Sequence, residues 1–143
     1  MQTNSQLLLA GYEAWNCDDC DAWLALLDPE IQIHTSGVFP DLSAEYRGHR
    51  RARKFWRQLR EPWETFSIEV ERIEEEGDCA AAAIRFRARG VDSGVEVDMR
   101  FGSAIRVRDG LAIELVNRRT FDEVRAAMRD AQPTPRGAAQ PTI

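Results

Sequence analysis

The feature that most constrains the fold is the stretch from residue 95 to residue 123, where apolar and polar side chains alternate on both sides of one turn. The turn is Arg108-Asp109-Gly110, and the alternation predicts two long strands that pair across it as a hairpin. Successive side chains of a strand point to opposite faces, so the pattern assigns every residue to a face. Thr120 and Glu123 fit a capping box, which predicts that a helix begins directly after the second strand.

One face of the first hairpin strand carries nearly all of its large apolar side chains, and we expect it to face the core. The residues on this face are Val95, Val97, Met99, Phe101, Ser103, Ile105 and Val107. In the second strand, one face carries Leu111, Ile113, Leu115, Asn117 and Arg119. The hairpin therefore predicts that Asn117 points inward, with Ser103 as its neighbour across the turn.

The rest of the chain completes an α+β pattern. Apolar spacing predicts helices near residues 7–15, 19–28 and 48–61, and alternation predicts strands at 30–35, 66–76 and 79–89. The expected order is α-α-β-α-β-β-β-β-α, a cone-shaped, curved antiparallel sheet with helices gathered on its concave face. The open end of such a cone is a natural pocket. We expect residues 1–130 to form a single domain and residues 131–143, rich in proline and small polar residues, to be a disordered tail.

The composition excludes some classes of function. A length of 143 residues fits one domain, and a net charge of −5 argues against a nucleic-acid binder. The local exception is the basic segment His49–Lys54, which we interpret as the solvated face of a predicted helix. No apolar run is long enough to span a membrane, and the first six residues do not resemble a signal peptide. We therefore expect a cytoplasmic protein without a nucleic-acid or membrane partner.

The cysteines give no strong chemical signal. Cys17 and Cys20 form a CxxC, but this pair lies between two predicted helices instead of following a strand. A structural zinc site would need four ligands, and no second pair of cysteines follows. Glycine-rich phosphate loops and histidine-rich metal motifs are also absent from the sequence. We expect free thiols, no metal and no cofactor.

Four short motifs occur in an order that resembles the SnoaL-like, polyketide cyclase-like group of the nuclear transport factor 2-like superfamily. The motifs are Tyr46-Arg47-Gly48-His49, Ile73-Glu74-Glu75-Glu76-Gly77-Asp78, Gly94-Val95-Glu96-Val97 and Arg106-Val107-Arg108-Asp109-Gly110. The resemblance covers about residues 5 to 130 and implies the cystatin-like cone fold. The superfamily contains cyclases, isomerases, epoxide hydrolases and non-catalytic binding domains, so the resemblance implies no single activity.

The resemblance also implies acidic positions that this chain fills with other residues. Cyclases and epoxide hydrolases of the superfamily have an acid at the position of Asn117. Ketosteroid isomerases have a carboxyl group near Ser103 and a base near Thr35, and the epoxide hydrolases have an Arg-Asp pair roughly at Ala83 and Arg85. No carboxylate remains at these positions. Proton transfer needs a group of tunable pKa, so whether the protein is an enzyme stays open.

Asn117, Arg85 and Arg119 are the candidate catalytic residues. Asn117 would orient a carbonyl or hydroxyl group, and an arginine would stabilise negative charge. The phase of the middle strand is ambiguous: either Arg85 faces the pocket, or Ile84 and Phe86 do. The expected ligand-binding residues are Tyr12, Trp15, Ile33, Thr35, Phe39, Trp56, Met99, Phe101 and Ser103.

The sequence thus predicts a pocket for a small, mostly apolar metabolite that carries a carbonyl or carboxylate group. Two functions fit this pocket. One is a cofactor-independent isomerase, cyclase or hydratase, and the other is a non-catalytic ligand-binding or regulatory domain. We also expect a homodimer that forms through the outer face of the sheet, because exposed apolar patches framed by charge mark interfaces. The predicted outer strip consists of Ile84, Phe86, Gly102, Ala104 and Val116.

Overall fold

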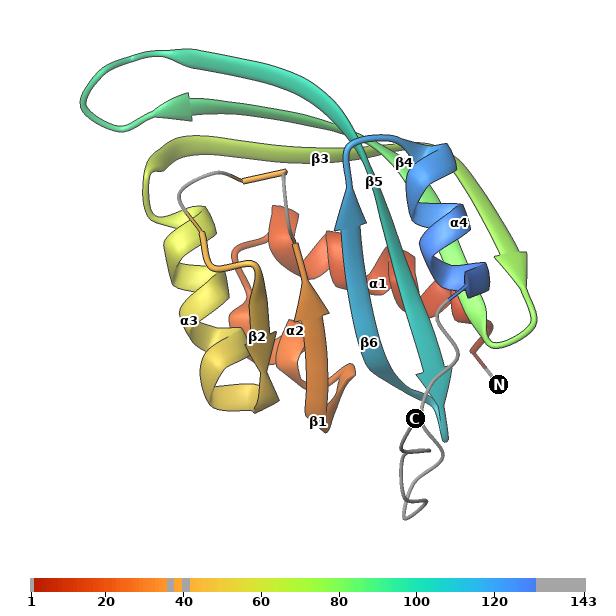
Figure 1. Cartoon of the computed structure of the whole chain (residues 1–143). Coiled ribbons are helices and arrows are strands. Elements are labelled where there is room, and N and C mark those ends of the chain that lie inside the picture. The colour runs from red at the N-terminus through yellow and green to blue at the C-terminus, as the bar shows by residue number, and fades with distance from the viewer. Residues whose placement is uncertain (1, 36–37, 40–41, 131–143) are drawn as a thin grey trace.

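The computed structural model describes residues 2–35, 38–39 and 42–130, and it confirms the predicted α+β fold (Figure 1). Its helices are α1 (Asn4–Asn16), α2 (Cys20–Leu24), α3 (Gly48–Arg60) and α4 (Phe121–Asp130). Its strands are β1 (Leu27–His34), β2 (Glu45–Arg47), β3 (Trp63–Glu76), β4 (Cys79–Gly90), β5 (Glu96–Arg108) and β6 (Leu111–Arg118). The segment 131–143, predicted to be a disordered tail, lies outside the described residues.

The strands form one curved, unclosed sheet in the order β2-β1-β6-β5-β4-β3. β1 runs parallel to β6, and the other neighbouring strands are antiparallel. The long strands β3, β4 and β5 arch over the helices, as Figure 1 shows. The sequence pattern missed β2, because three residues are too few to show an alternation. It also placed Leu27 in the second helix, whereas Leu27 is the first residue of β1 and pairs with Ala112. The strand pairing is irregular between Leu27 and Gln32, and Pro29 lies in this irregular part.

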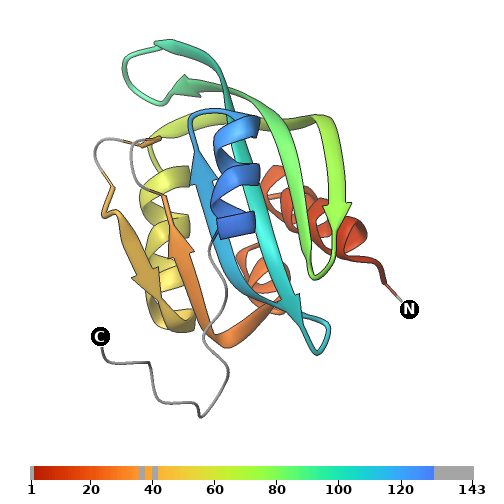
Figure 2. The same ribbon diagram turned by 45° about the vertical axis from the view of Figure 1, so that its right-hand side comes forward.

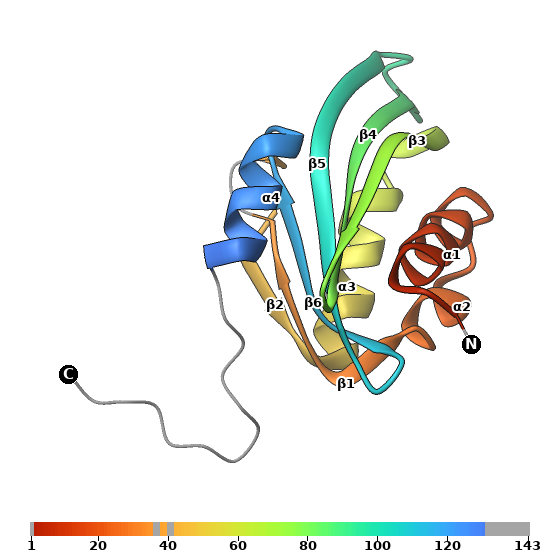
Figure 3. The ribbon, with the colours of Figure 1, turned by 90° about the vertical axis from the view of Figure 1, so that its right-hand side faces the viewer.

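The helices cover both faces of the sheet (Figures 2 and 3). α1, α2 and α3 lie against the concave face, as predicted, while α4 lies on the opposite face. Thr120 caps α4 by accepting a hydrogen bond at Oγ1 from the backbone N–H of Glu123, at 3.1 Å. The start of α4 also passes close to β5 at Gly102. A Cβ atom at this position would lie 2.4 Å from the carbonyl oxygen of Thr120, so the close approach requires glycine.

The prediction of an exposed apolar strip on the outer face of the sheet is wrong, because α4 covers part of the strip and the rest faces the core. Ala104 and Val116 are buried in a cluster with Val124 and Met128 of α4. Ile84 and Phe86 face the other way and belong to the concave core, at 0% and 2% exposure. These residues therefore form no exposed surface. The homodimer stays a prediction, but this strip no longer supports it.

The concave core is rich in stacked aromatic rings. Trp15 of α1 stacks on Trp56 of α3 with ring centroids 3.9 Å apart, and on Phe66 of β3 at 5.6 Å. Trp23 meets Trp15 edge-on at 5.2 Å. These contacts join three helices to the arching part of the sheet, so the aromatic residues fill much of the cone.

A side chain of α1 covers part of the edge strand β3. Asn16 donates a hydrogen bond from Nδ2 to the carbonyl oxygen of Ile68 at 2.9 Å, and its Oδ1 accepts one from the N–H of Ile68 at 2.7 Å. Both backbone polar groups of Ile68 are thereby satisfied without a neighbouring strand.

Candidate functional site

Four uncharged polar residues approach one another at the concave face: Tyr12 of α1, Thr35 just after β1, Ser103 of β5 and Asn117 of β6. Ser103 and Asn117 are direct partners across the hairpin, which confirms the predicted neighbours. Asn117 donates a hydrogen bond from Nδ2 to Oγ1 of Thr35 at 3.3 Å. Thr35, Ser103 and Asn117 are all buried, so their polar groups need partners inside the protein or from a ligand.

The hydroxyl group of Tyr12 stands out in this cluster. It is buried and makes no well-formed hydrogen bond within the described part of the chain, and the Ser103 side chain lies close enough for a weak interaction with it. Burial raises the pKa of Tyr12 well above its usual range, and the nearby Ser103 opposes this shift only in part. Tyr12 is therefore a neutral phenol at physiological pH, able to donate a hydrogen bond to an acceptor that enters the site.

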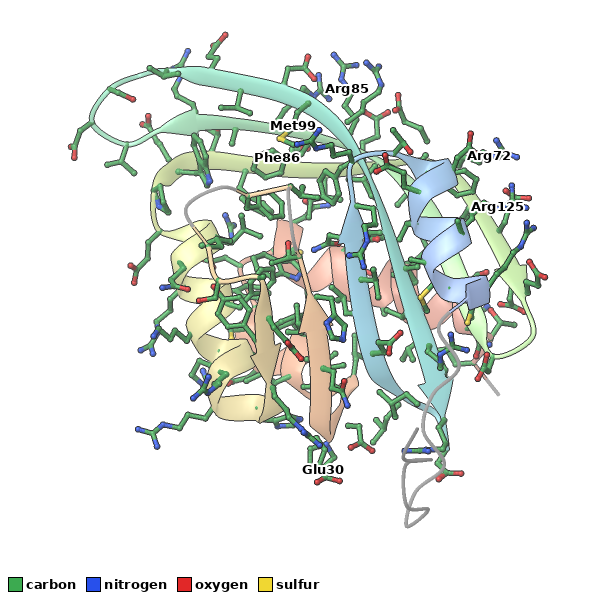
Figure 4. The ribbon with its side chains drawn as sticks, viewed as in Figure 1. Glu30, Arg72, Arg85, Phe86, Met99 and Arg125 are labelled. Carbon is green, nitrogen blue, oxygen red and sulfur yellow. The ribbon has the colours of Figure 1, made fainter. Side chains whose placement is uncertain are left out.

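The polar cluster borders a cavity of about 40 Å³. Its apolar walls include Trp15, Phe39 and Phe101, and Tyr12, Ser103 and Asn117 supply its polar groups. The cavity has room for about one water molecule, whereas typical ligand pockets measure about 300–1,000 Å³. Other predicted ligand-binding residues do not line it: Ile33 and Trp56 are packed in the core, and Met99 pairs with Phe86 farther along the sheet (Figure 4).

The structure settles the ambiguous phase of the middle strand. Arg85 lies on the outer face, where its guanidinium group donates two hydrogen bonds to Asp98, at 3.0 and 2.7 Å (Figure 4). Ala83 shares this outward phase, and the buried residues Ile84 and Phe86 face the core. Of the two phases that the sequence left open, the one with Ile84 and Phe86 facing the core is correct, so Arg85 cannot act in the pocket as a candidate catalytic residue.

Arg119 does not reach the cavity either. β6 ends at Arg118, so the alternation that predicted an inward Arg119 stops one residue too early. The side chain of Arg119 is exposed. The structure therefore brings neither candidate arginine to Asn117, and the site contains no positive charge from these residues.

Sequence reasoning missed the chemical importance of Tyr12. It was expected among the ligand-binding residues only as one member of an apolar helix face. No Asp, Glu or His lines the cavity in the ranges that the structure describes. His34 points to the other side of β1, where its Nδ1 atom is 4.0 Å from Oε1 of Glu45. A tyrosine on an otherwise apolar helix face is the sequence signal that marks this site.

A larger hollow of about 780 Å³ lies outside the cone, between α4 and the turn that joins β3 to β4. Its charged walls pair with one another. Arg106 is 3% exposed and donates hydrogen bonds to Oδ1 of Asp78 at 3.0 Å and to the carbonyl oxygen of Met128 at 2.8 Å. Arg125 lies 3.6 Å from Glu74. These contacts hold α4 in place, and Figure 4 shows Arg125 near Arg72 of β3.

Further features of the described residues bear on function. No helix in the described part of the chain is long and apolar enough to cross a membrane. No group of three or more His, Cys, Asp or Glu side chains among those residues is arranged to hold a metal ion. Cys17, Cys20 and Cys79 are free thiols, and burial raises the pKa of Cys79 to about 12. The two cysteines of the CxxC therefore form no disulfide, and Cys20 Sγ accepts a hydrogen bond from Arg53 at 3.8 Å.

The curved, open sheet with three helices on its concave face is the architecture of nuclear transport factor 2-like proteins. Within this class, the model of the SnoaL-like domain matches residues 8–115, and the chain belongs to that family. This fold suggests a small-molecule-binding domain.

Three solved structures illustrate the similarity. A nuclear transport factor 2-like protein of unknown function from Burkholderia pseudomallei is 22% identical, with a TM-score of 0.74 over 87% of this chain and 95% of the other. A putative SnoaL-like polyketide cyclase from Jannaschia sp. CCS1 is 20% identical, with a TM-score of 0.71 over 91% and 93%. TerC, co-crystallised with polyporic acid, is 18% identical, with a TM-score of 0.71 over 87% and 95%. Such identities establish a shared fold alone, and no curated protein sequence matches the chain.

Proposed function

We propose that the concave cavity binds a small, largely apolar molecule through an acceptor oxygen such as a carbonyl. The buried hydroxyl of Tyr12 is the observation that carries this proposal. A buried polar group without a partner costs about 1–3 kcal/mol, and a ligand oxygen would remove that cost. Asn117 uses one amide N–H for Thr35 and has a second N–H and an oxygen to offer.

The walls of the site favour a flat, neutral ligand. Trp15, Phe39 and Phe101 present aromatic surface, which suits a planar apolar molecule. Since Arg85 and Arg119 point elsewhere, a carbonyl group fits the site better than the carboxylate that the sequence left possible. The complex of the related TerC with polyporic acid supports a small organic ligand for this fold.

Ligand entry requires a wider cavity. The ring of Phe39 meets Phe101 edge-on with centroids 5.6 Å apart, and it meets Phe86 at 6.5 Å. Phe39 belongs to the connection between β1 and β2, whereas Phe101 and Phe86 are fixed in the sheet. We therefore expect a bound ligand to displace the side chain of Phe39 and take its place against Phe101.

Binding without catalysis is the function that the geometry supports best. The described lining of the cavity contains no carboxylate or histidine, and the raised pKa of Tyr12 keeps its proton in place. The second candidate is a cofactor-independent isomerase, cyclase or hydratase, which the same phenol favours. A buried neutral donor stabilises an oxyanion as it forms, although the proton acceptor would then come from the ligand or from water.

The test measures binding of 2,3-dimethyl-1,4-naphthoquinone through the quenching of tryptophan fluorescence. This flat apolar molecule has two carbonyl oxygens, and its methyl groups block addition by the free thiols. We expect Tyr12→Phe to weaken binding about tenfold, because it removes one hydrogen bond worth about 1.5 kcal/mol. Tyr46→Phe is the matched control, since Tyr46 bonds Gln58 outside the cavity. Equal affinity of the two variants, or no binding by the unsubstituted protein, would contradict the proposal.

We also propose that the protein forms a homodimer through the part of the outer sheet face that α4 leaves open. This part carries the ion pairs of β3, β4 and β5, such as Arg85 with Asp98 and Arg100 with Glu71. Sedimentation equilibrium tests the dimer, and a monomer at all concentrations would exclude it.

A further inference from the structure

Four positive side chains gather on the exposed side of α3, away from the concave cavity. They are Arg50, Arg51, Lys54 and Arg57. Together with Ser43, Glu45 and Tyr46 at β2, they line a groove of about 490 Å³. Phe55 and Leu59 of the same helix line the concave cavity. The groove and the cavity are therefore two separate sites on opposite sides of α3.

The four cations of this basic groove make no ion pair with any residue that the structure describes. Neighbouring arginines of α3 are paired: Arg53 lies 2.8 Å from Asp21, and Arg60 lies 3.1 Å from Asp18. Like charges three or four residues apart on a helix repel one another. Glu45 is the one carboxylate among the described residues that line the groove, so the groove keeps a surplus of positive charge that favours an anionic partner.

The groove is held in shape by contacts in its floor. The hydroxyl of Tyr46 donates a hydrogen bond to Oε1 of Gln58 at 2.7 Å and accepts one from the N–H of Ser43 at 3.1 Å. Gly48 has φ +83°, a conformation that lets β2 lead directly into α3. Arg50 and Arg51 lie in the first turn of α3, where the helix dipole adds positive potential.

We propose that the basic groove binds a small molecule that carries two or more linked phosphate groups. Arginine guanidinium groups bind phosphate oxygens in pairs of hydrogen bonds, and three of the four cations are arginines. Residues 50 to 57 span about 10 Å along the helix, which suits a short row of phosphates. A long nucleic acid needs a more extended basic track, and the acidic balance of the chain opposes it.

The experiment titrates the full chain with inorganic tripolyphosphate and measures the heat of binding. We expect Lys54→Gln to weaken binding about fivefold and the double variant Arg51→Gln with Lys54→Gln to weaken it more than about tenfold. Arg53→Gln is the matched control, because it removes the same charge from the adjacent residue, which faces Asp21. Affinity should fall as salt rises from about 50 to 200 mM, and orthophosphate should bind more weakly than tripolyphosphate.

Three results would overturn the proposal. They are an absence of tripolyphosphate binding at low salt, equal weakening by Arg53→Gln and Lys54→Gln, and equal affinity for orthophosphate and tripolyphosphate. A parallel arm uses vesicles that contain a phosphorylated inositol lipid. Sedimentation with these vesicles in the absence of tripolyphosphate binding would assign the groove to a membrane instead. The circular dichroism spectrum of each variant reports that the fold is intact, and binding of the naphthoquinone tests the concave cavity independently.

Discussion

The two faces of β4 and β5 differ in how their polar side chains are paired. On the outer face, Arg85 pairs with Asp98, and further ion pairs join these strands to one another and to β3. On the concave face, the polar groups are few, uncharged and buried, and the hydroxyl of Tyr12 has no partner among the described residues. The outer face satisfies its charges within the protein and with water, whereas the concave face has hydrogen-bonding capacity left for a ligand. Stability should therefore depend strongly on the concave face and only weakly on these exposed ion pairs of the outer one.

The largest expected difference in the free energy of unfolding is between substitutions of two adjacent residues of β4. Ile84→Ala should lower the free energy of unfolding by about 2–5 kcal/mol, because it removes buried contacts and leaves a cavity. Arg85→Ala should lower it by less than about 1 kcal/mol, because its ion pair with Asp98 is partly exposed. Urea unfolding of both variants gives the comparison. If both changes cost the same, the assignment of the two faces is wrong.

An acid placed at the site should make stability depend on pH. In Asn117→Asp, burial should raise the pKa of the new carboxyl group above its value of about 3.9 in the unfolded chain. The variant should then match the original protein at low pH and lose about 1–3 kcal/mol as pH rises towards 7, because ionisation favours the unfolded state. Thermal melts across this pH range measure the loss. The exposed change Gln2→Glu serves as control, and an equal pH dependence in the two variants would contradict a buried site.

The smallest effect is expected from the ion pairs of the outer face. A double-mutant cycle on Arg100 and Glu71, which are 2.8 Å apart, should give a coupling of about 0.2–1 kcal/mol at low salt. Added salt should weaken this coupling further, because both side chains are in contact with solvent. A coupling above about 2 kcal/mol would show that the outer face stabilises the fold more than its exposure implies.

The sequence predicted the hairpin part of the site well. The strict alternation of β5 and β6 and the short turn between them set the register, so Ser103 and Asn117 were correctly placed as neighbours. β4 was harder, because both of its phases carry bulky side chains. Packing of Ile84 and Phe86 in the concave core, together with the partner Asp98 on β5, places Arg85 outside.

The sequence pattern could not predict on which face of the sheet α4 lies. A strip of small apolar residues such as Gly102 and Ala104 fits a dimer contact and an intramolecular helix equally well. The close approach at Thr120 decides between them, and it depends on where the chain turns after β6. The free hydroxyl of Tyr12 is likewise a property of three-dimensional packing, since its partners would come from distant segments.

The contact of Asn16 with the edge of β3 bears on how the sheet ends. A side-chain amide has the same donor and acceptor as a peptide group, and Asn16 presents both to the backbone of Ile68. Asn16 therefore takes the place that one residue of an additional strand would occupy beside β3. At this position a strand from another molecule has no free hydrogen-bonding groups to join, so α1 limits edge-to-edge growth of the sheet as well as closing the cone.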